Sequence, residues 1–73
     1  MSTLAELAVG NRARVVRVEG NDSLGLRLLE MGMTPGAEVT VLGTAPLGDP
    51  IEVELRGYRL SVRKTEAARV EIE

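Results

Sequence analysis

The sequence predicts a small, mainly β domain, a barrel of about five short strands with one short helix inserted after the first strand. Three observations predict it. The chain has 73 residues, which leaves room for one hydrophobic core. Several short segments alternate apolar and polar residues, which is typical of strands that bury one face. A single segment repeats its leucines at helical spacing instead. We therefore expect residues 1–73 to form one domain.

The first predicted strand covers residues 12–19, in which β-branched and charged residues dominate. Gly10 and Asn11 form a turn before it. The apolar and polar alternation changes phase at Val15 and Val16. Such a change of phase predicts a β-bulge or a sharp bend.

The predicted helix covers residues 24–31, with Asp22 or Ser23 as its N-cap and Gly32 as the left-handed residue at its C-terminal end. At about 100° per residue, its apolar side chains divide between two faces. One stripe holds Leu24, Leu28 and Met31, and the roughly opposite side holds Leu26 and Leu29. One apolar stripe is enough to bury a surface helix, so the second is a candidate contact surface.

Four further strands are predicted at residues 37–44, 51–56, 58–63 and 69–73, with a helical turn at 64–68. Gly57 makes a tight hairpin between the strands at 51–56 and 58–63. Short antiparallel strands with one apolar face each must close on themselves. An SH3-like barrel is the economical solution.

The composition argues against an enzyme. The chain contains no cysteine and no histidine, so Ser2, Ser23 and Ser61 lack the usual base and no thiolate metal site is available. The glycines stand singly at turns rather than in a phosphate-binding loop. We expect a protein that works by binding a partner.

The charge and the aromatic content also limit the kind of partner. The net charge is −2 and Tyr58 is the only aromatic residue, so no nucleic-acid partner is expected. No apolar run is long enough to span a membrane, and no leader opens the chain. We expect a cytoplasmic protein without direct membrane insertion.

Four segments carry a family resemblance, at residues 4–10 (LAELAVG), 27–39 (RLLEMGMTPGAEV), 45–51 (APLGDPI) and 57–63 (GYRLSVR). In this order they resemble the FeoA family of ferrous iron transport proteins. The resemblance implies an SH3-like barrel and a role beside FeoB, the membrane GTPase that imports Fe²⁺. The leading hypothesis is an accessory protein that binds FeoB and modulates ferrous iron uptake, in an oligomeric state that the sequence leaves open.

The candidate partner-binding residues are Leu26, Leu29, Met33, Pro46 and Leu47. Exposed apolar patches mark interaction sites, and methionine adapts its shape to a partner. We expect the stiff loop at 45–50 to frame a shallow groove beside the second helix face. Two alternatives stay open: Leu4 and Leu7 fold over that face, or the loop is only a rigid turn.

The alternative function is direct binding of Fe²⁺ as a sensor or carrier. Glu52 and Glu54 share one strand face and are the candidate ligands, for weak binding of Fe²⁺ or another divalent ion. A tight Fe²⁺ site without histidine is unusual, so no cofactor is expected. The competing interpretation is a solvated strand face beside arginines of the late strands, Arg56, Arg59 and Arg63.

Overall fold

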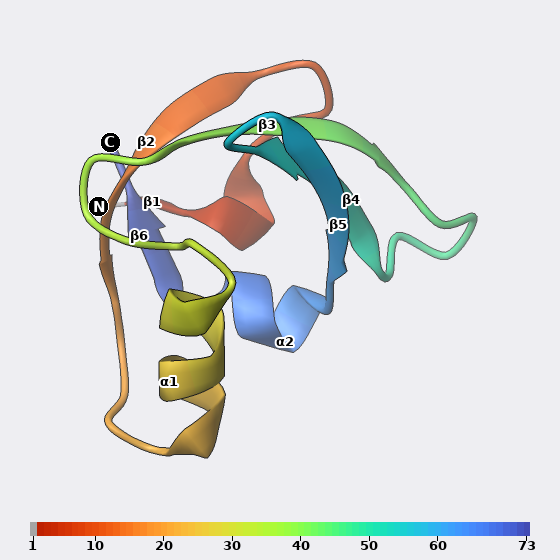
Figure 1. The fold of residues 1–73 in the computed structure, drawn as a ribbon. Helices are drawn as coiled ribbons and strands as arrows, with labels where there is room; N and C mark the ends of the chain where they lie inside the picture. Colours follow the sequence, from red (N-terminus) through yellow and green to blue (C-terminus); the bar gives the residue numbers. More distant parts are fainter. Residues whose placement is uncertain (1) are drawn as a thin grey trace.

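The strands form one strongly curved antiparallel sheet in the order β1-β6-β2-β3-β4-β5 (Figure 1). The computed structural model describes residues 2–73. Within this range the strands are β1 (Ser2–Thr3), β2 (Arg12–Val18), β3 (Glu38–Thr44), β4 (Ile51–Leu55), β5 (Tyr58–Val62) and β6 (Val70–Ile72). The helical segments are η1 (Leu4–Glu6), α1 (Ser23–Glu30) and α2 (Lys64–Ala67).

The predicted order of elements is confirmed. Strands β2 to β6 and helix α1 begin and end within one residue of the predicted positions, and α2 occupies the predicted helical turn. The sequence missed β1, which pairs with β6 through only two residues, Ser2 and Thr3. A strand of this length shows no alternation. No helix within residues 2–73 has the length and apolar character needed to cross a membrane.

The bulge predicted in β2 is confirmed and explains the shape of the sheet. Residues 12–14 of β2 pair with β3, whereas residues 15–18 pair with β6, and the register with β6 shifts between Val15 and Arg17. A bulge bends a strand and increases its twist. Strand β2 thereby belongs to both halves of the curved sheet. A second register shift, between Val41 and Gly43 of β3, was not predicted.

The core lies inside the curved sheet and receives side chains from both helices and from η1. Its buried apolar residues are Leu4, Val15, Leu28, Met33, Ala37, Val39, Val41, Ile51, Val53, Leu55, Val62, Ala67, Val70 and Ile72. Leu28 shows that the predicted inner stripe of α1 faces the core, with Leu24 and Met31 half-buried beside it. The other face of α1 is left to solvent.

Candidate partner-binding surface

Two leucines on the outer face of α1 are exposed. Leu26 is 58% exposed and Leu29 is 39% exposed, and we call this pair the α1 patch. A shallow depression beside the patch is lined by Gly20, Asn21 and Asp22. Two large apolar side chains on one helix face, open to solvent in so small a domain, offer a partner a surface to cover.

The N-terminal end of α1 is fixed by Asp22. Its Oδ1 atom accepts a hydrogen bond from the Gly25 N–H at 3.1 Å and another from Arg69 Nη1 at 2.6 Å. The Arg69 guanidinium, followed by the Gly25 N–H, lowers the pKa of Asp22 to about 2. The helix is thus capped and joined to the turn that precedes β6.

Gly25 allows α1 to lie close to the preceding turn. A β-carbon at this position would be 2.4 Å from the carbonyl oxygen of Gly20, so any larger residue would push the helix away. This contact explains why a helix of eight residues tolerates a glycine in its first turn.

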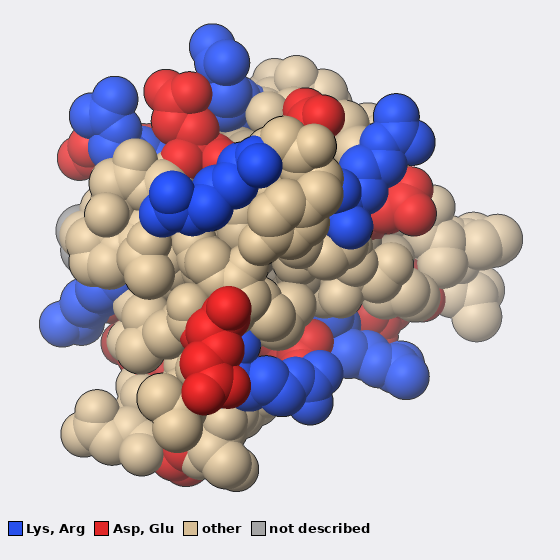
Figure 2. All heavy atoms as spheres, viewed as in Figure 1, with Lys and Arg blue, Asp and Glu red and all other residues tan. Residues whose placement is uncertain are grey.

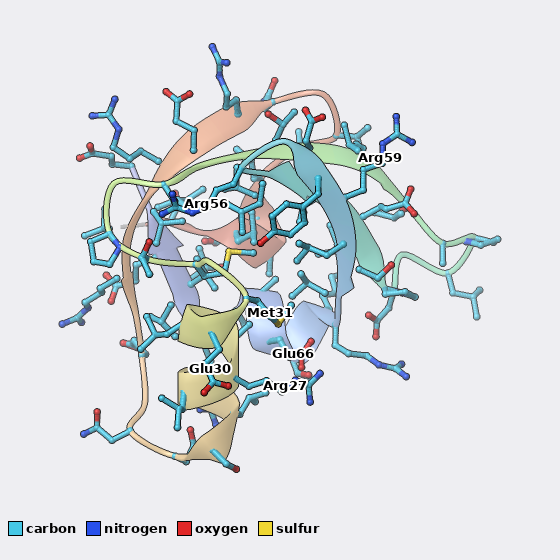
Figure 3. All side chains as sticks on the ribbon, viewed as in Figure 1. Arg27, Glu30, Met31, Arg56, Arg59 and Glu66 are labelled. Carbon is cyan, nitrogen blue, oxygen red and sulfur yellow. The ribbon has the colours of Figure 1, made fainter. Side chains whose placement is uncertain are left out.

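An ion pair joins the middle of α1 to α2. Arg27 Nη2 lies 3.3 Å from Glu66 Oε2, and the two side chains point toward each other in Figure 3. The Glu66 side chain is only 8% exposed, and its Oε1 also accepts a hydrogen bond from the Arg63 N–H at 2.8 Å. Glu66 therefore caps α2 and holds α1 against it.

The C-terminal end of α1 is joined to the β4–β5 hairpin. The Tyr58 hydroxyl donates to the Met31 carbonyl at 2.9 Å, and Arg56 Nη2 donates to Thr34 Oγ1 at 2.7 Å. Figure 3 labels one residue from each side of this junction, Met31 directly after α1 and Arg56 between β4 and β5. With both ends and the middle fixed, α1 presents Leu26 and Leu29 from a rigid position.

The structure corrects the predicted position of Met33. Its side chain is completely buried in the core and does not belong to the α1 patch. Gly32 has φ of 108°, so the chain leaves the helix before Met33 and the helical spacing no longer applies. The alternative that Leu4 and Leu7 cover this helix face is also wrong. Leu4 is buried in the core, and η1 packs against α2 and β6.

The loop with Pro46 and Leu47 lies away from the α1 patch. It projects between β3 and β4 at the right of Figure 1, whereas α1 lies at the lower left. Leu47 is 95% exposed at this loop. The predicted groove between the helix and the loop is therefore wrong, and the two sets of candidate residues form separate surfaces.

Glu52 and Glu54 lie on the exposed outer face of β4, opposite Ser61 and Arg59 of β5. The register places Arg59 across from Glu54, as the interpretation of a solvated strand face expects, although no ion pair joins them. Within residues 2–73 no three acidic side chains are grouped so that they could hold a metal ion.

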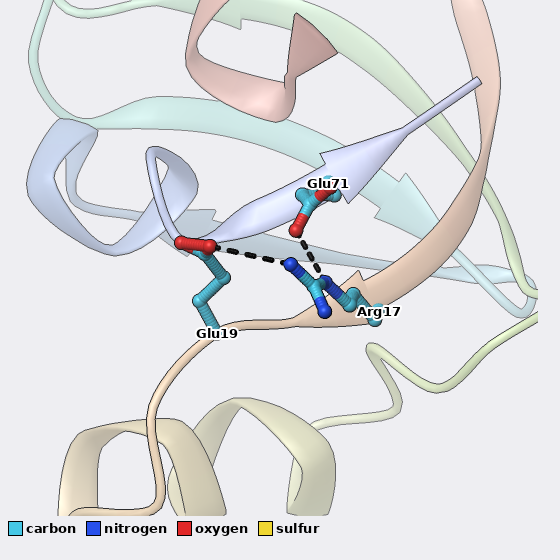
Figure 4. Close-up of polar contacts among 3 residues, drawn as sticks. All are labelled: Arg17, Glu19 and Glu71. Atoms are coloured by element: carbon cyan, nitrogen blue, oxygen red, sulfur yellow. Dashed lines mark hydrogen bonds and ion pairs between the residues drawn. The ribbon is translucent and has the colours of Figure 1, made fainter. Parts of the chain in front are cut away.

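The other strand carboxylates form structural ion pairs. Arg17 lies between Glu19, at 3.6 Å, and Glu71, to which its Nε donates a hydrogen bond (Figure 4). The carboxylate of Glu71 raises the pKa of Arg17. The contact between Arg17 and Glu71 joins β2 to β6 beside the bulge, so Glu71 is already engaged by an arginine.

The cations divide into two groups. Within residues 2–73, ion pairs engage Arg12, Arg14, Arg17, Arg27 and Arg69. In the remaining cations, Arg56, Arg59, Arg63 and Lys64, the charged side-chain group forms no ion pair within residues 2–73, and all four belong to one segment around β5. We call them the β5 cations. In the view of Figure 2, lysine and arginine side chains alternate with acidic side chains around an area of uncharged residues. The sequence shows these residues, but only the structure shows that they form no ion pair within residues 2–73.

A model of the FeoA domain matches residues 2–73. The chain belongs to the FeoA domain family. The resemblance seen in the sequence is thus confirmed. The chain is also 43% identical over 70 residues to the Fe²⁺ transport protein A/Fe²⁺ transporter FeoB fusion protein of Porphyromonas gingivalis. The match covers 96% of this chain and 8% of that much longer protein.

Solved structures of FeoA proteins share the fold. The FeoA-like protein of Clostridium acetobutylicum is 35% identical with a TM-score of 0.92, over 97% of this chain and 83% of that one. FeoA of Stenotrophomonas maltophilia, complexed with zinc, is 34% identical with a TM-score of 0.88, over 100% and 91% of the two chains. It is described as a prokaryotic SH3-domain protein, and the predicted SH3-like fold is confirmed.

Proposed function

We propose that this FeoA-family chain binds the cytosolic part of a FeoB-type transporter and modulates its uptake of ferrous iron, without a reaction of its own. The observation that carries the proposal is the fusion protein of Porphyromonas gingivalis, in which a segment similar to this chain is part of the same polypeptide as FeoB. A fusion keeps two domains at high effective concentration, which suits partners that act together.

Modulation requires only that the chain bind one conformation of FeoB more tightly than another. A ligand shifts an equilibrium by its difference in affinity for the two states, and a tenfold difference corresponds to about 1.4 kcal/mol. No catalytic group is needed for this mechanism. It places the chain on the cytoplasmic side, where the GTPase part of the transporter works.

The α1 patch is the docking surface that we assign to FeoB. Leu26 and Leu29 are exposed apolar side chains on a helix held by Asp22, Glu66 and Tyr58. A preorganised apolar surface loses little conformational entropy on binding. The exposed Leu47 lies on a separate loop and serves as the comparison.

The binding test is a calorimetric titration of the full chain with the cytosolic region of FeoB, without nucleotide, with GDP and with a non-hydrolysable GTP analogue. We expect binding in at least one nucleotide state. An absence of heat in all three states at high micromolar concentration would overturn the proposal.

Two matched variants locate the surface. Leu26→Asp combined with Leu29→Asp places charge on the α1 patch and should weaken binding by at least about tenfold, because charged groups are poorly tolerated in an apolar contact. Leu47→Asp introduces the same chemistry on the distant loop and should leave the affinity unchanged. The opposite pattern would assign docking to the loop at 45–50.

A further inference from the structure

Strand β5 is the last strand of the sheet and has a free edge. Within residues 2–73 it pairs with β4 alone, through the register Leu55↔Tyr58 to Ile51↔Val62. Arg56 and Gly57 connect the two strands with φ of 53° and 85°, the positive values of the two-residue turn that suits hairpin twist. This geometry determines which main-chain groups of β5 face outward.

In a hairpin with a two-residue turn, the pair that flanks the turn is hydrogen-bonded, and hydrogen-bonded pairs alternate along the strands. Tyr58, Leu60 and Val62 therefore direct their N–H and C=O groups toward β4. Arg59 and Ser61 direct theirs away from it, and within residues 2–73 no hydrogen bond engages these groups. The free edge of β5 thus offers two donors and two acceptors to an added strand.

The side chains of β5 indicate the pattern of that strand. Leu60 is half-buried and Val62 is buried on the inner face, whereas Arg59 and Ser61 are exposed on the outer face. Strand β4, which pairs with β5, alternates apolar and acidic residues in the sequence Ile51-Glu52-Val53-Glu54-Leu55. A strand of the same alternation would match β5 from its other side, because cross-strand pairs of opposite charge are favourable.

The positive charge along β5 indicates which kind of strand could pair with its free edge. The β5 cations form no ion pair within residues 2–73, so an acidic segment would supply the missing carboxylates. A second copy of β5 would instead bring arginines together, and cations on an edge strand discourage such pairing. The net charge of −2 and the single aromatic residue do not favour a nucleic acid.

We propose that the free edge of β5 binds an extended peptide segment that alternates acidic and apolar residues. The segment adds as a further strand and places its acidic side chains opposite Arg59 and beside Arg63. The interaction depends on β5 alone and stands whether or not the α1 patch binds FeoB.

The test uses the full ¹⁵N-labelled chain and the peptide acetyl-SEVEVES-amide, followed by amide hydrogen exchange. The amides of Arg59 and Ser61 should exchange about tenfold more slowly with the peptide at about ten times its Kd. The amides of Tyr58, Leu60 and Val62 should be protected before the peptide is added. The peptide acetyl-SKVKVKS-amide should have no effect.

Variants separate the main-chain contact from the side chains. Ser61→Pro removes an outward N–H, which an edge strand tolerates, and should abolish peptide binding while the NMR spectrum shows a folded chain. The matched Ser61→Ala keeps the N–H and should bind as the wild type does. Equal binding by both variants would overturn the strand-addition model.

A charge-reversed variant keeps the test decisive if Ser61→Pro does not fold. Arg59→Glu combined with Arg63→Glu should weaken binding of the acidic peptide about tenfold and favour the lysine peptide. Protection of other amides in place of Arg59 and Ser61 would overturn the proposal. Binding of oligothymidylate at this edge in preference to the acidic peptide would do so too.

Discussion

Helix α1 and strand β5 use their charged residues in different ways. Around α1, Asp22 and Arg27 each have an ionic partner, Arg69 and Glu66, and these contacts hold the helix in place. What α1 leaves open is apolar, the pair Leu26 and Leu29. Along β5 the situation is reversed, because in the described part of the chain the β5 cations form no ion pair and the main chain has a free edge. Paired charges here support structure, and unpaired ones remain available to a ligand.

Substitutions on the two faces of α1 should show the largest difference in the free energy of unfolding. Leu28→Ala should lower the free energy of unfolding by about 2–5 kcal/mol, because it removes a side chain that is completely buried. Leu26→Ala, on the exposed face, should change it by no more than about 0.5 kcal/mol. Urea denaturation followed by circular dichroism measures both. Similar losses for the two variants would mean that the faces of α1 have been assigned incorrectly.

The junction between α1 and α2 should show the next largest effect. Glu66→Ala leaves the Arg63 N–H without its acceptor and releases Arg27, at an expected cost of about 1–3 kcal/mol. Glu30→Ala removes an exposed carboxylate from α1 that has no ion pair within residues 2–73, and is the matched control. Thermal unfolding of the two variants side by side measures the difference. If Glu66→Ala lowers the stability no more than Glu30→Ala does, Glu66 does not help to hold α1 in place.

The cap at Asp22 should show a pH dependence. Its pKa is lowered to about 2 in the folded chain, against about 3.9 for an unfolded aspartate. A lowered pKa contributes stability that is fully present above the unfolded value and is lost as the pH falls through the folded one. The wild type should therefore lose its advantage over Asp22→Asn between about pH 4 and pH 2. Urea midpoints measured across this range test it, and a constant difference would contradict the ion pair with Arg69.

The smallest effect should come from the β5 cations. Arg59→Gln should change the free energy of unfolding by no more than about 0.5 kcal/mol, because no carboxylate in the described part of the chain pairs with it. Arg27→Gln removes an arginine that is paired with Glu66 and should cost more. Chemical denaturation under identical buffer conditions compares them. A larger loss from Arg59→Gln would show that β5 charges support the fold after all.

Much of the fold could be predicted because its signals are local. Alternation along β4, the N-cap at Asp22 and the phase change at Val15 each depend on a few neighbouring residues. The candidate surface was harder to predict. Met33 follows Leu26 and Leu29 at helical spacing in the sequence, but the chain leaves the helix at Gly32 and buries Met33. Leu47 lies on a loop away from α1, and no local pattern shows this distance.

The sequence by itself determined the strand pattern and the presence of one helix, at 24–31, with apolar residues on two faces. These properties depend on residue type and near neighbours. Only the tertiary structure decided that Leu26 and Leu29 stay exposed, that Met33 is buried, and that the β5 cations form no ion pair within residues 2–73. Those outcomes depend on tertiary contacts between segments that are distant in the sequence, and local periodicity carries no information about such contacts.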